Sequence, residues 1–287
     1  MRILLVFAHY FSGEDNPRHA STDLSRQDDR RLAIESAILA WRGHFGTTAV
    51  LDVGNKAFHL GPRSDHTVDI VVATTNDKHL MTPEFCAKAG AQVAKFEMEN
   101  PRMLGFKAQE VFASLRNSYD MFVFSEDDLK INDAQIVDKL AWFNQTFGYK
   151  RVLFPNRVEW NRAGPALKTY IDGDLAGRVS KVMKSFVADD EVLYGSPLGQ
   201  PASFQRARNP HSGFFAVTRD QLSYWIDQPH WLDRDCNFVS PLESSATLGI
   251  AKTFSIYKPY GHSASFLEIE HLDSRFTGMK LPVRTRL

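Results

Sequence analysis

The stretch from Tyr119 to Ile131 reads YDMFVFSEDDLKI, and it decides the fold that we expect for this chain. Met121–Ser125 forms an apolar strand, and the carboxylates Glu126, Asp127 and Asp128 follow it without a break. A short apolar run of this kind is typical of a strand that is covered on both faces of a parallel sheet. In such sheets ligands bind beyond the carboxyl ends of the strands. The stretch therefore predicts a buried strand that delivers three carboxylates to a ligand-binding edge.

On both sides of this stretch, strand-like and helix-like segments alternate along the chain. Alternation of this kind implies βαβ crossovers and a mainly parallel sheet, so the expected fold class is α/β with helices flanking a central sheet. The expected strands lie at 2–8, 68–74, 91–98, 121–125, 151–160, 212–218 and 253–259, and the expected helices at 30–46, 105–118, 133–147, 219–226 and 241–250.

Residues 160–210 interrupt this alternation. They are rich in Gly, Pro, Asp and Arg and show little periodicity, which indicates a long, loop-rich excursion. Long loops on folds of this type often serve binding. We find no internal repeat, so we expect one domain over residues 1–287 that carries this excursion.

The bulk composition excludes several classes of protein. Lys+Arg and Asp+Glu both number 34 in 287 residues, so the chain lacks the basic footprint of a protein that binds an extensive nucleic-acid surface. Two cysteines, Cys86 and Cys236, are too few for a disulfide framework. The N-terminal apolar run lacks a signal-peptide cleavage site, and no apolar run reaches the ~18 residues of a membrane span. We expect a soluble, cytoplasmic protein without a transmembrane segment.

The acidic triplet calls for a positive partner. Adjacent carboxylates repel one another, and a cation or basic groups must offset that repulsion. Mg²⁺ and Mn²⁺ prefer oxygen ligands and typically bind one or two carboxylates together with substrate phosphates. The triplet therefore fits a metal–diphosphate site. Alternatively it is a solvated turn in which Asp127 or Asp128 caps the helix that begins near Asp133.

An apolar strand that ends in an acidic triplet resembles the DXD signature of GT-A glycosyltransferases, here with Glu126 in the first place. The preceding helix, GFKAQEVFASLRNSYD, resembles the helix that leads into that signature. NPHSGFFAVTRDQL, beginning at Asn209, is similar to the acceptor-side segment of such enzymes. The Glu-Asp-Asp form departs from the commonest triplet, so whether one or two side chains contact the metal stays open.

The resemblance implies a GT-A, Rossmann-like fold with a nucleotide-sugar-binding half over 1–130 and an acceptor-binding half over 131–287. It implies metal-dependent transfer of a sugar, as in polysaccharide biosynthesis, from a UDP- or GDP-sugar to a glycan or glycoconjugate. Asp128 and Glu126 would be the ligands of Mn²⁺ or Mg²⁺, and Asp127 would face the ribose of the donor. His262 in YKPYGHS matches the C-terminal metal ligand, and His271 in EIEHLDS competes for the same task.

The helix that begins near Pro241 carries the expected catalytic group. By the resemblance, Glu243 in SPLESSATLG is the general base that removes the proton of the acceptor hydroxyl in an inverting mechanism. Equally, Glu243 is an ordinary first-turn glutamate that the helix dipole favours. A retaining mechanism needs no such base, and the sequence does not decide between the two mechanisms.

The ends of the first two strands are the expected cradle for the nucleotide. Backbone groups and an aromatic ring there are suited to hold a base and ribose, and a basic group before the acidic strand is suited to contact the diphosphate. Plain strand-end turns and solvated helix charges are the alternative interpretation. The residues expected to bind the donor are Ala8, His9, Tyr10, Thr74, Asn76, Lys107 and Asp127.

Three competing functions remain. LLVFAHYFSGED resembles the start of zinc-dependent sugar deacetylases, but Tyr10-Phe11 stand where a proline and an acid are needed. A nucleotidyltransferase should carry a Gly-rich, basic loop after the first strand, and the loop here has only Gly13. The third is a GT-A-like domain that binds a nucleotide-sugar or glycan without turnover.

Overall fold

The computed structural model describes residues 1–13, 21–161, 164–173, 182–186, 191–279 and 281–283. Its central sheet has five strands in the order β13-β6-β1-β4-β5. All neighbouring pairs are parallel except β13 with β6. The α/β class with a mainly parallel sheet, predicted from the sequence, is confirmed. The strands are β1 (Arg2–Ala8), β4 (Thr67–Thr75), β5 (Ala91–Phe96), β6 (Met121–Glu126) and β13 (Phe214–Thr218).

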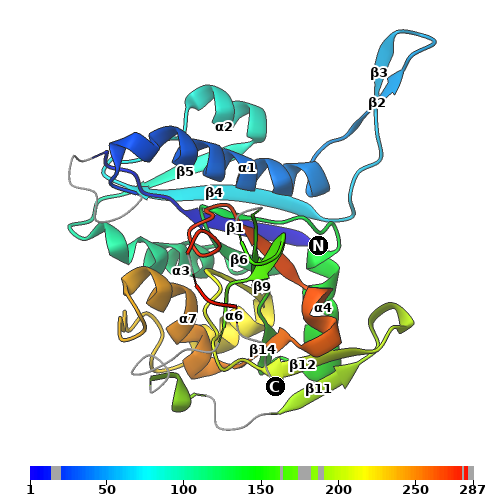
Figure 1. Ribbon diagram of the computed structural model, residues 1–287. Coiled ribbons are helices and arrows are strands. Elements are labelled where there is room, and N and C mark those ends of the chain that lie inside the picture. The colour runs from blue at the N-terminus through cyan, green and yellow to red at the C-terminus, as the bar shows by residue number, and fades with distance from the viewer. Residues whose placement is uncertain (14–20, 162–163, 174–181, 187–190, 280, 284–287) are drawn as a thin grey trace.

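Helices cover both faces of this sheet (Figure 1). Alternate residues of β1 point to opposite faces, so Leu5 packs in the core on the α1 side and Val6 in the core on the α3 side. This two-sided burial explains why the strand sequences are apolar without alternation. The helices on the first side are α1 (Gln27–Phe45), α2 (Pro83–Ala89) and α4 (Ile136–Phe147), and those on the second are α3 (Leu104–Ser114), α6 (Arg219–Ile226) and α7 (Pro241–Thr253).

Two four-stranded sheets lie beside the main one, in the orders β10-β9-β15-β7 and β11-β12-β14-β8. The first matters for the site, because β15 pairs with β7 directly after the acidic triplet. Its strands are β7 (Leu129–Lys130), β9 (Asn156–Trp160), β10 (Lys168–Tyr170) and β15 (Glu268–His271). The strands of the second are β8 (Arg151–Leu153), β11 (Val192–Gly195), β12 (Ala202–Arg206) and β14 (Ser255–Pro259).

The remaining elements are a two-stranded hairpin of β2 (Ala49–Asp52) and β3 (Ala57–Leu60), and short 3₁₀ helices. The 3₁₀ helices are η1 (Leu24–Arg26), η2 (Pro101–Met103), η3 (Pro197–Gly199) and η4 (Gly261–Phe266).

The structure corrects two expectations. The strand expected over 151–160 is broken at Pro155, and its halves β8 and β9 join different sheets. Proline has no N–H to donate to a ladder, which favours a break there. The excursion over 160–210 contains β10, β11 and β12, while its residues 162–163, 174–181 and 187–190 lie outside the described part. Within the described residues, no helix is both long and apolar enough to cross a bilayer.

Candidate functional site

The acidic triplet lies at the carboxyl end of β6, between β1 and β13, with Glu126 opposite Ala8. The loop before β13 comes very close to it, because the Glu126 N–H donates to the carbonyl of Gly213 at 2.8 Å. Gly213 has φ +61°, and a Cβ at this position would overlap Glu126 Oε2. Glycine is therefore required here both for the backbone conformation and for the approach to the carboxylate.

We expect Gly213→Ala to lower the free energy of unfolding by about 2–3 kcal/mol, because it adds overlap with Glu126 to left-handed strain. Gly261→Ala is the matched control, since Gly261 has φ +59° and no heavy atom within 4 Å of a Cβ. The control should lose only about 1 kcal/mol, for the strain alone. Urea unfolding of both variants measures the difference, and equal losses would show that the contact with Glu126 has no energetic weight.

Asp127 is fixed by two side chains and is almost fully buried. The Leu80 N–H donates to His9 Nε2 at 3.1 Å, which leaves the proton of a neutral His9 on Nδ1, 2.6 Å from Asp127 Oδ2. Arg30 contacts Asp127 Oδ1. Burial acts to raise the pKa of Asp127, but the Arg30 charge and the His9 hydrogen bond outweigh it and hold this pKa at about 2. Asp127 is thus a charged anchor whose two oxygens already have partners.

These contacts bear on two expectations. Arg30 and His9 both contact the carboxylate of Asp127, the residue expected to face the ribose of the donor. Both nitrogens of His9 are also engaged, so His9 is not free to bind zinc as the deacetylase alternative requires.

The two carboxylate oxygens of Asp128 differ in their hydrogen bonds. Arg30 Nη1 donates to its Oδ2 at 2.9 Å, and His271 Nε2 lies 3.8 Å from the same atom. Its Oδ1 is buried and has no hydrogen-bond partner among the residues that the structure describes. A buried polar atom without a partner is costly, so an unpaired carboxylate oxygen marks a place for an absent donor or cation.

The pKa of Glu126 is shifted by its burial and by the neighbouring carboxylates. Burial raises its pKa to about 8, and the negative charge of Asp128 adds to this, while Arg157 acts in the opposite direction. The Glu243 charge also contributes to the shift, so the electrostatic environment of Glu126 includes α7. Glu126 and Asp128 therefore form a pair of carboxylates that a positive ion would relieve.

His271, rather than His262, is brought to the triplet. Because His271 pairs with Leu129 across β15 and β7, it lies next to Asp128. Its Nδ1 is 2.9 Å from Glu159 Oε1 and 2.7 Å from the Asp273 carbonyl, two acceptors, which leaves Nε2 as the open nitrogen. A histidine oriented by a carboxylate in this way is the usual arrangement of a metal ligand. His262 lies exposed in η4, and no contact among the described residues joins it to the triplet.

A second charged cluster, formed by Asp172, Arg157 and Lys258, was not predicted from the sequence. Asp172 accepts from Arg157 Nε at 3.0 Å and Nη2 at 2.8 Å, and from Lys258 Nζ at 2.8 Å. Lys258 also donates to the His211 carbonyl at 2.9 Å. Burial, and then the charge of Arg157, lowers the pKa of His211 to about 3, so this histidine is neutral. Asp172 holds Arg157 in place, and the positive charge of Arg157 acts to lower the pKa of Glu126.

Glu243 lies in the first turn of α7, and the Ser240 hydroxyl donates to its carboxylate. α7 begins with Pro241, whose fixed φ suits the first helical position. The charge of Glu243 contributes to the raised pKa of Glu126, so the expected general base acts electrostatically on the triplet. The same position at the helix start is also compatible with the helix-dipole interpretation.

The other residues expected to bind the donor are mostly engaged with the protein itself. Ala8 and Thr74 are buried, and Thr74 Oγ1 donates to the Lys78 carbonyl at 3.2 Å. Asn76 has φ +51°, and its side chain donates to the Met98 carbonyl at 2.8 Å. Tyr10 and Lys107 were also expected to bind the donor. Tyr10 packs against the core on the α3 side, and Lys107 pairs with Glu110 at 2.7 Å.

As they stand, no three His, Cys, Asp or Glu side chains within the described ranges form a ready metal-binding group. The donor set nevertheless fits a hard divalent cation that takes only part of its shell from the protein. Asp128 Oδ1 is unpartnered, Glu126 is repelled by Asp128, and His271 presents Nε2 beside them. Mg²⁺ normally keeps waters and takes phosphate oxygens as its remaining ligands.

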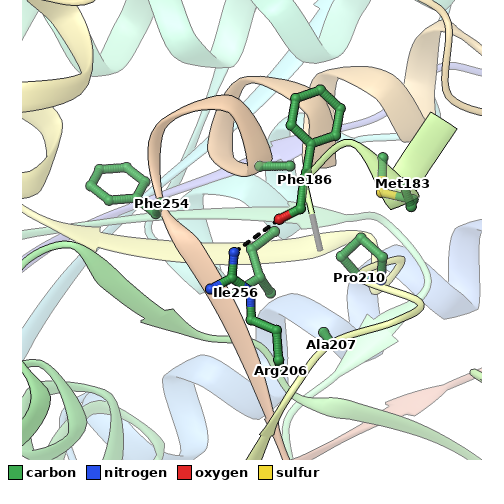
Figure 2. Close-up of a pocket in the computed structure, with 8 residues that line it drawn as sticks. Met183, Phe186, Arg206, Ala207, Pro210, Phe254 and Ile256 are labelled. Carbon is green, nitrogen blue, oxygen red and sulfur yellow. Dashed lines mark hydrogen bonds between the residues drawn. The ribbon is translucent and has the colours of Figure 1, made fainter. Parts of the chain in front are cut away.

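The apolar pocket in Figure 2 lies elsewhere, against β12 and β14. It has about 10 Å³ of free space, and Arg206 crosses it to donate to the Phe186 carbonyl at 2.9 Å. That space holds one water molecule at most, so the pocket is not a substrate site.

No protein-family model matches the sequence, and no curated protein matches it. Glucosyl-3-phosphoglycerate synthase from Mycobacterium tuberculosis, solved with Mn²⁺, UDP and phosphoglyceric acid, matches at 16% identity and a TM-score of 0.35 over 76% of this chain. This chain spans 56% of the length of that synthase.

Two other solved structures are similar. A candidate nucleotide-diphospho-sugar transferase from Desulfovibrio desulfuricans matches at 9% identity and a TM-score of 0.41, over 90% of this chain and 78% of that one. Mannose-1-phosphate geranyltransferase from Thermus thermophilus matches at 11% identity and a TM-score of 0.40, over 90% and 73%. Each of these matches is a distant likeness, and at these identities and TM-scores none carries an argument about the activity or substrate of this chain.

Proposed function

We propose that this protein is a metal-dependent glycosyltransferase. It transfers a sugar from a nucleotide-diphosphate-sugar, with UDP- or GDP-sugars favoured, to a glycan or glycoconjugate acceptor. The observation that carries the proposal is Asp128 Oδ1, which lies beside Glu126 at the carboxyl end of β6 and has no hydrogen-bond partner in the described part of the chain. Ligands bind at this edge of parallel sheets, and two crowded carboxylates there suit a cation with a diphosphate.

Mn²⁺ or Mg²⁺ is the proposed cofactor, held by Asp128, Glu126 and His271. When bound, it supplies a Lewis acid that neutralises the charge of the leaving diphosphate. His262 drops out of the proposed ligand set, because His271 is the histidine that lies beside Asp128.

The protein's own residues have two proposed roles, which are to position the metal ligands and to transfer a proton. Arg30 fixes Asp127 and Asp128 together, and His9 holds Asp127 from the other side, so Asp128 is presented in one orientation. We assign Asp127 and His9 to this positioning role. Glu243, oriented by the Ser240 hydroxyl, is the proposed base for the acceptor hydroxyl.

The nucleotide is proposed to lie across the carboxyl ends of β1 and β4. Ala8 ends β1 and Tyr10 follows it, while Thr74 lies at the end of β4 and Asn76 just after it, so these residues border the same edge as the triplet. Lys107, in α3, is the proposed contact for the diphosphate, and it would exchange its pair with Glu110 for a phosphate oxygen.

Calorimetric titration tests the proposal. One of UDP, GDP, CDP and ADP should bind in the presence of Mn²⁺ and not after chelation. Asp128→Asn should weaken that metal-dependent binding by about 10- to 100-fold, because it removes a charged ligand while keeping the side-chain shape. Asp138→Asn is the control, since Asp138 is an exposed carboxylate paired with His66 at 2.9 Å. Binding that is unchanged in Asp128→Asn, or the absence of any nucleotide binding to the wild type, would contradict the proposal.

A further inference from the structure

The β2–β3 hairpin connects α1 to β4 and projects away from the body of the molecule (Figure 1). β2 pairs only with β3, so both outer edges of this small sheet are open within the described chain. Large apolar side chains on the hairpin are exposed: Leu51 by 56%, Phe58 by 75% and Leu60 by 74%. An exposed apolar patch on a projecting arm is unusual for a monomeric protein and marks an interaction site.

The register places these side chains on one face. In an antiparallel pair, directly opposed residues share a face, and successive residues alternate between faces. Leu51 opposes Phe58 and Ala49 opposes Leu60, so all four lie on the same side. The other face carries the pairs Val50–His59 and Asp52–Ala57, which are partly polar. The hairpin is therefore amphipathic, and its apolar face is exposed at Leu51, Phe58 and Leu60.

The hairpin has a defined shape at both ends. At its base, Thr48 Oγ1 donates to the Pro62 carbonyl at 2.6 Å, and the Gly61 N–H donates to the Thr48 carbonyl at 2.8 Å. At its tip, the Asn55 N–H donates to Asp52 Oδ1 at 2.9 Å. A two-stranded hairpin alone is marginally stable in water and needs a layer against its apolar face. No such layer is present in the described part of the chain.

We propose that the hairpin is a dimerisation arm whose apolar face packs against the same face of a second copy of this chain. A twofold axis brings one patch against its own copy, so an apolar face meets an apolar face without any second specialised surface.

The exposed area agrees with this occupant. Leu51, Phe58 and Leu60 leave roughly 300 Å² of side chain open on one arm, taking roughly 200 Å² for a whole Phe side chain and roughly 120 Å² for a whole Leu side chain. Two copies together cover roughly 600 Å² of apolar surface, and apolar atoms make up roughly 60% of an interface. The total is then roughly 1,000 Å², which reaches the lower limit for a specific dimer.

The placement of charge disfavours insertion into a lipid surface. The tip of the hairpin carries Asp52, Asn55 and Lys56 beside the exposed Val53, and the apolar residues of the face lie along the strands behind it. A membrane-inserting hairpin would have to bury these polar groups first, whereas lateral packing against a second arm leaves them in water.

Sedimentation velocity of the full chain, from low to high micromolar concentration, tests the proposal. The wild type should show a concentration-dependent dimer. Phe58→Ser/Leu60→Ser should weaken the dimer at least tenfold, and Leu51→Ser should do the same. Val50→Ser is the matched control, because Val50 is the sequence neighbour of Leu51, is similarly exposed at 52% and lies on the opposite face. It should dimerise as the wild type does.

Several outcomes would overturn the proposal. These are a wild type that stays monomeric at every concentration, a dimer that survives Phe58→Ser/Leu60→Ser, and an equal loss in Val50→Ser. Flotation of the monomeric wild type with phosphatidylcholine–phosphatidylglycerol vesicles, abolished by Phe58→Ser/Leu60→Ser, would assign the arm to a membrane and overturn it as well. Circular dichroism confirms that each variant is folded, which is expected because the changed side chains are exposed.

Discussion

We expect Glu243→Gln to lower turnover by about 100- to 10,000-fold while leaving the affinity for the nucleotide nearly unchanged. A glutamine has the shape of glutamate but cannot accept a proton, and positioned proton transfer contributes rate factors of this size. The structure supports the assignment through two observations. The Ser240 hydroxyl orients the Glu243 carboxylate, and the charge of Glu243 acts on Glu126 of the acidic triplet.

The measurement is the rate of nucleoside diphosphate release from the donor that calorimetry identifies, with and without acceptor. Glu84→Gln is the matched control, because Glu84 lies in the first turn of α2, which also begins with a proline. If Glu243 serves only the helix dipole, both variants should lose a few tenths of a kcal/mol of stability and keep full turnover. Unchanged turnover in Glu243→Gln would also point to a retaining mechanism, which requires no base.

The main sheet could be predicted from the sequence because its signals are local. β1 and β6 are buried on both faces and β4 is apolar from Ile70 to Ala73, so each contains a continuous apolar run, and the helices between them carry regular apolar spacing. The β2–β3 hairpin was missed for the opposite reason. Its exposed Val50, Leu51, Phe58 and Leu60 are covered by nothing within the described chain, and no burial pattern distinguishes them from a loop.

Some residues of the candidate site could likewise be predicted from local sequence, and others could not. Glu126, Asp127 and Asp128 are adjacent in sequence, so one stretch predicts their common location. Arg30 joins them from 97 positions away, and this pairing follows from the packing of α1 on the sheet, which no short motif encodes. The sequence left His262 and His271 as competitors for the same role. The pairing of β15 with β7 places His271, the last residue of β15, beside Asp128, and this placement favours His271 in the proposed ligand set.

The largest loss of stability should come from Asp172→Asn, at about 3–5 kcal/mol, because breaking a buried ion pair leaves charge without compensation. Asp172 is the shared partner of Arg157 and Lys258, and the side chains of Asp172 and Arg157 are only 3% and 4% exposed. Burial already lowers the pKa of Lys258, and Asp172 opposes that shift. Without the negative charge of Asp172, the cations of Arg157 and Lys258 would lie in the interior with no shared carboxylate between them.

Urea unfolding of Asp172→Asn against Asp28→Asn measures this effect. Asp28 pairs with Arg31 at 3.4 Å on the surface of α1 and is 93% exposed, so its loss should cost less than about 1 kcal/mol. Similar costs in the two variants would show that the buried cluster contributes no more than a surface pair.

The same cluster predicts an acid limit of stability. Burial acts to raise the pKa of Asp172, but Lys258 and Arg157 outweigh it and lower this pKa from 3.8 to about 2. A carboxylate with a depressed pKa stabilises the folded state fully above its unfolded value, and that contribution is lost as the pH falls from about 3.8 to about 2. The loss amounts to roughly 2 kcal/mol, and Asp172→Asn should lack this part of the pH dependence. An identical acid profile in the variant would mean that Asp172 does not titrate in this window, and that its charge is not what holds Arg157 and Lys258 in the interior.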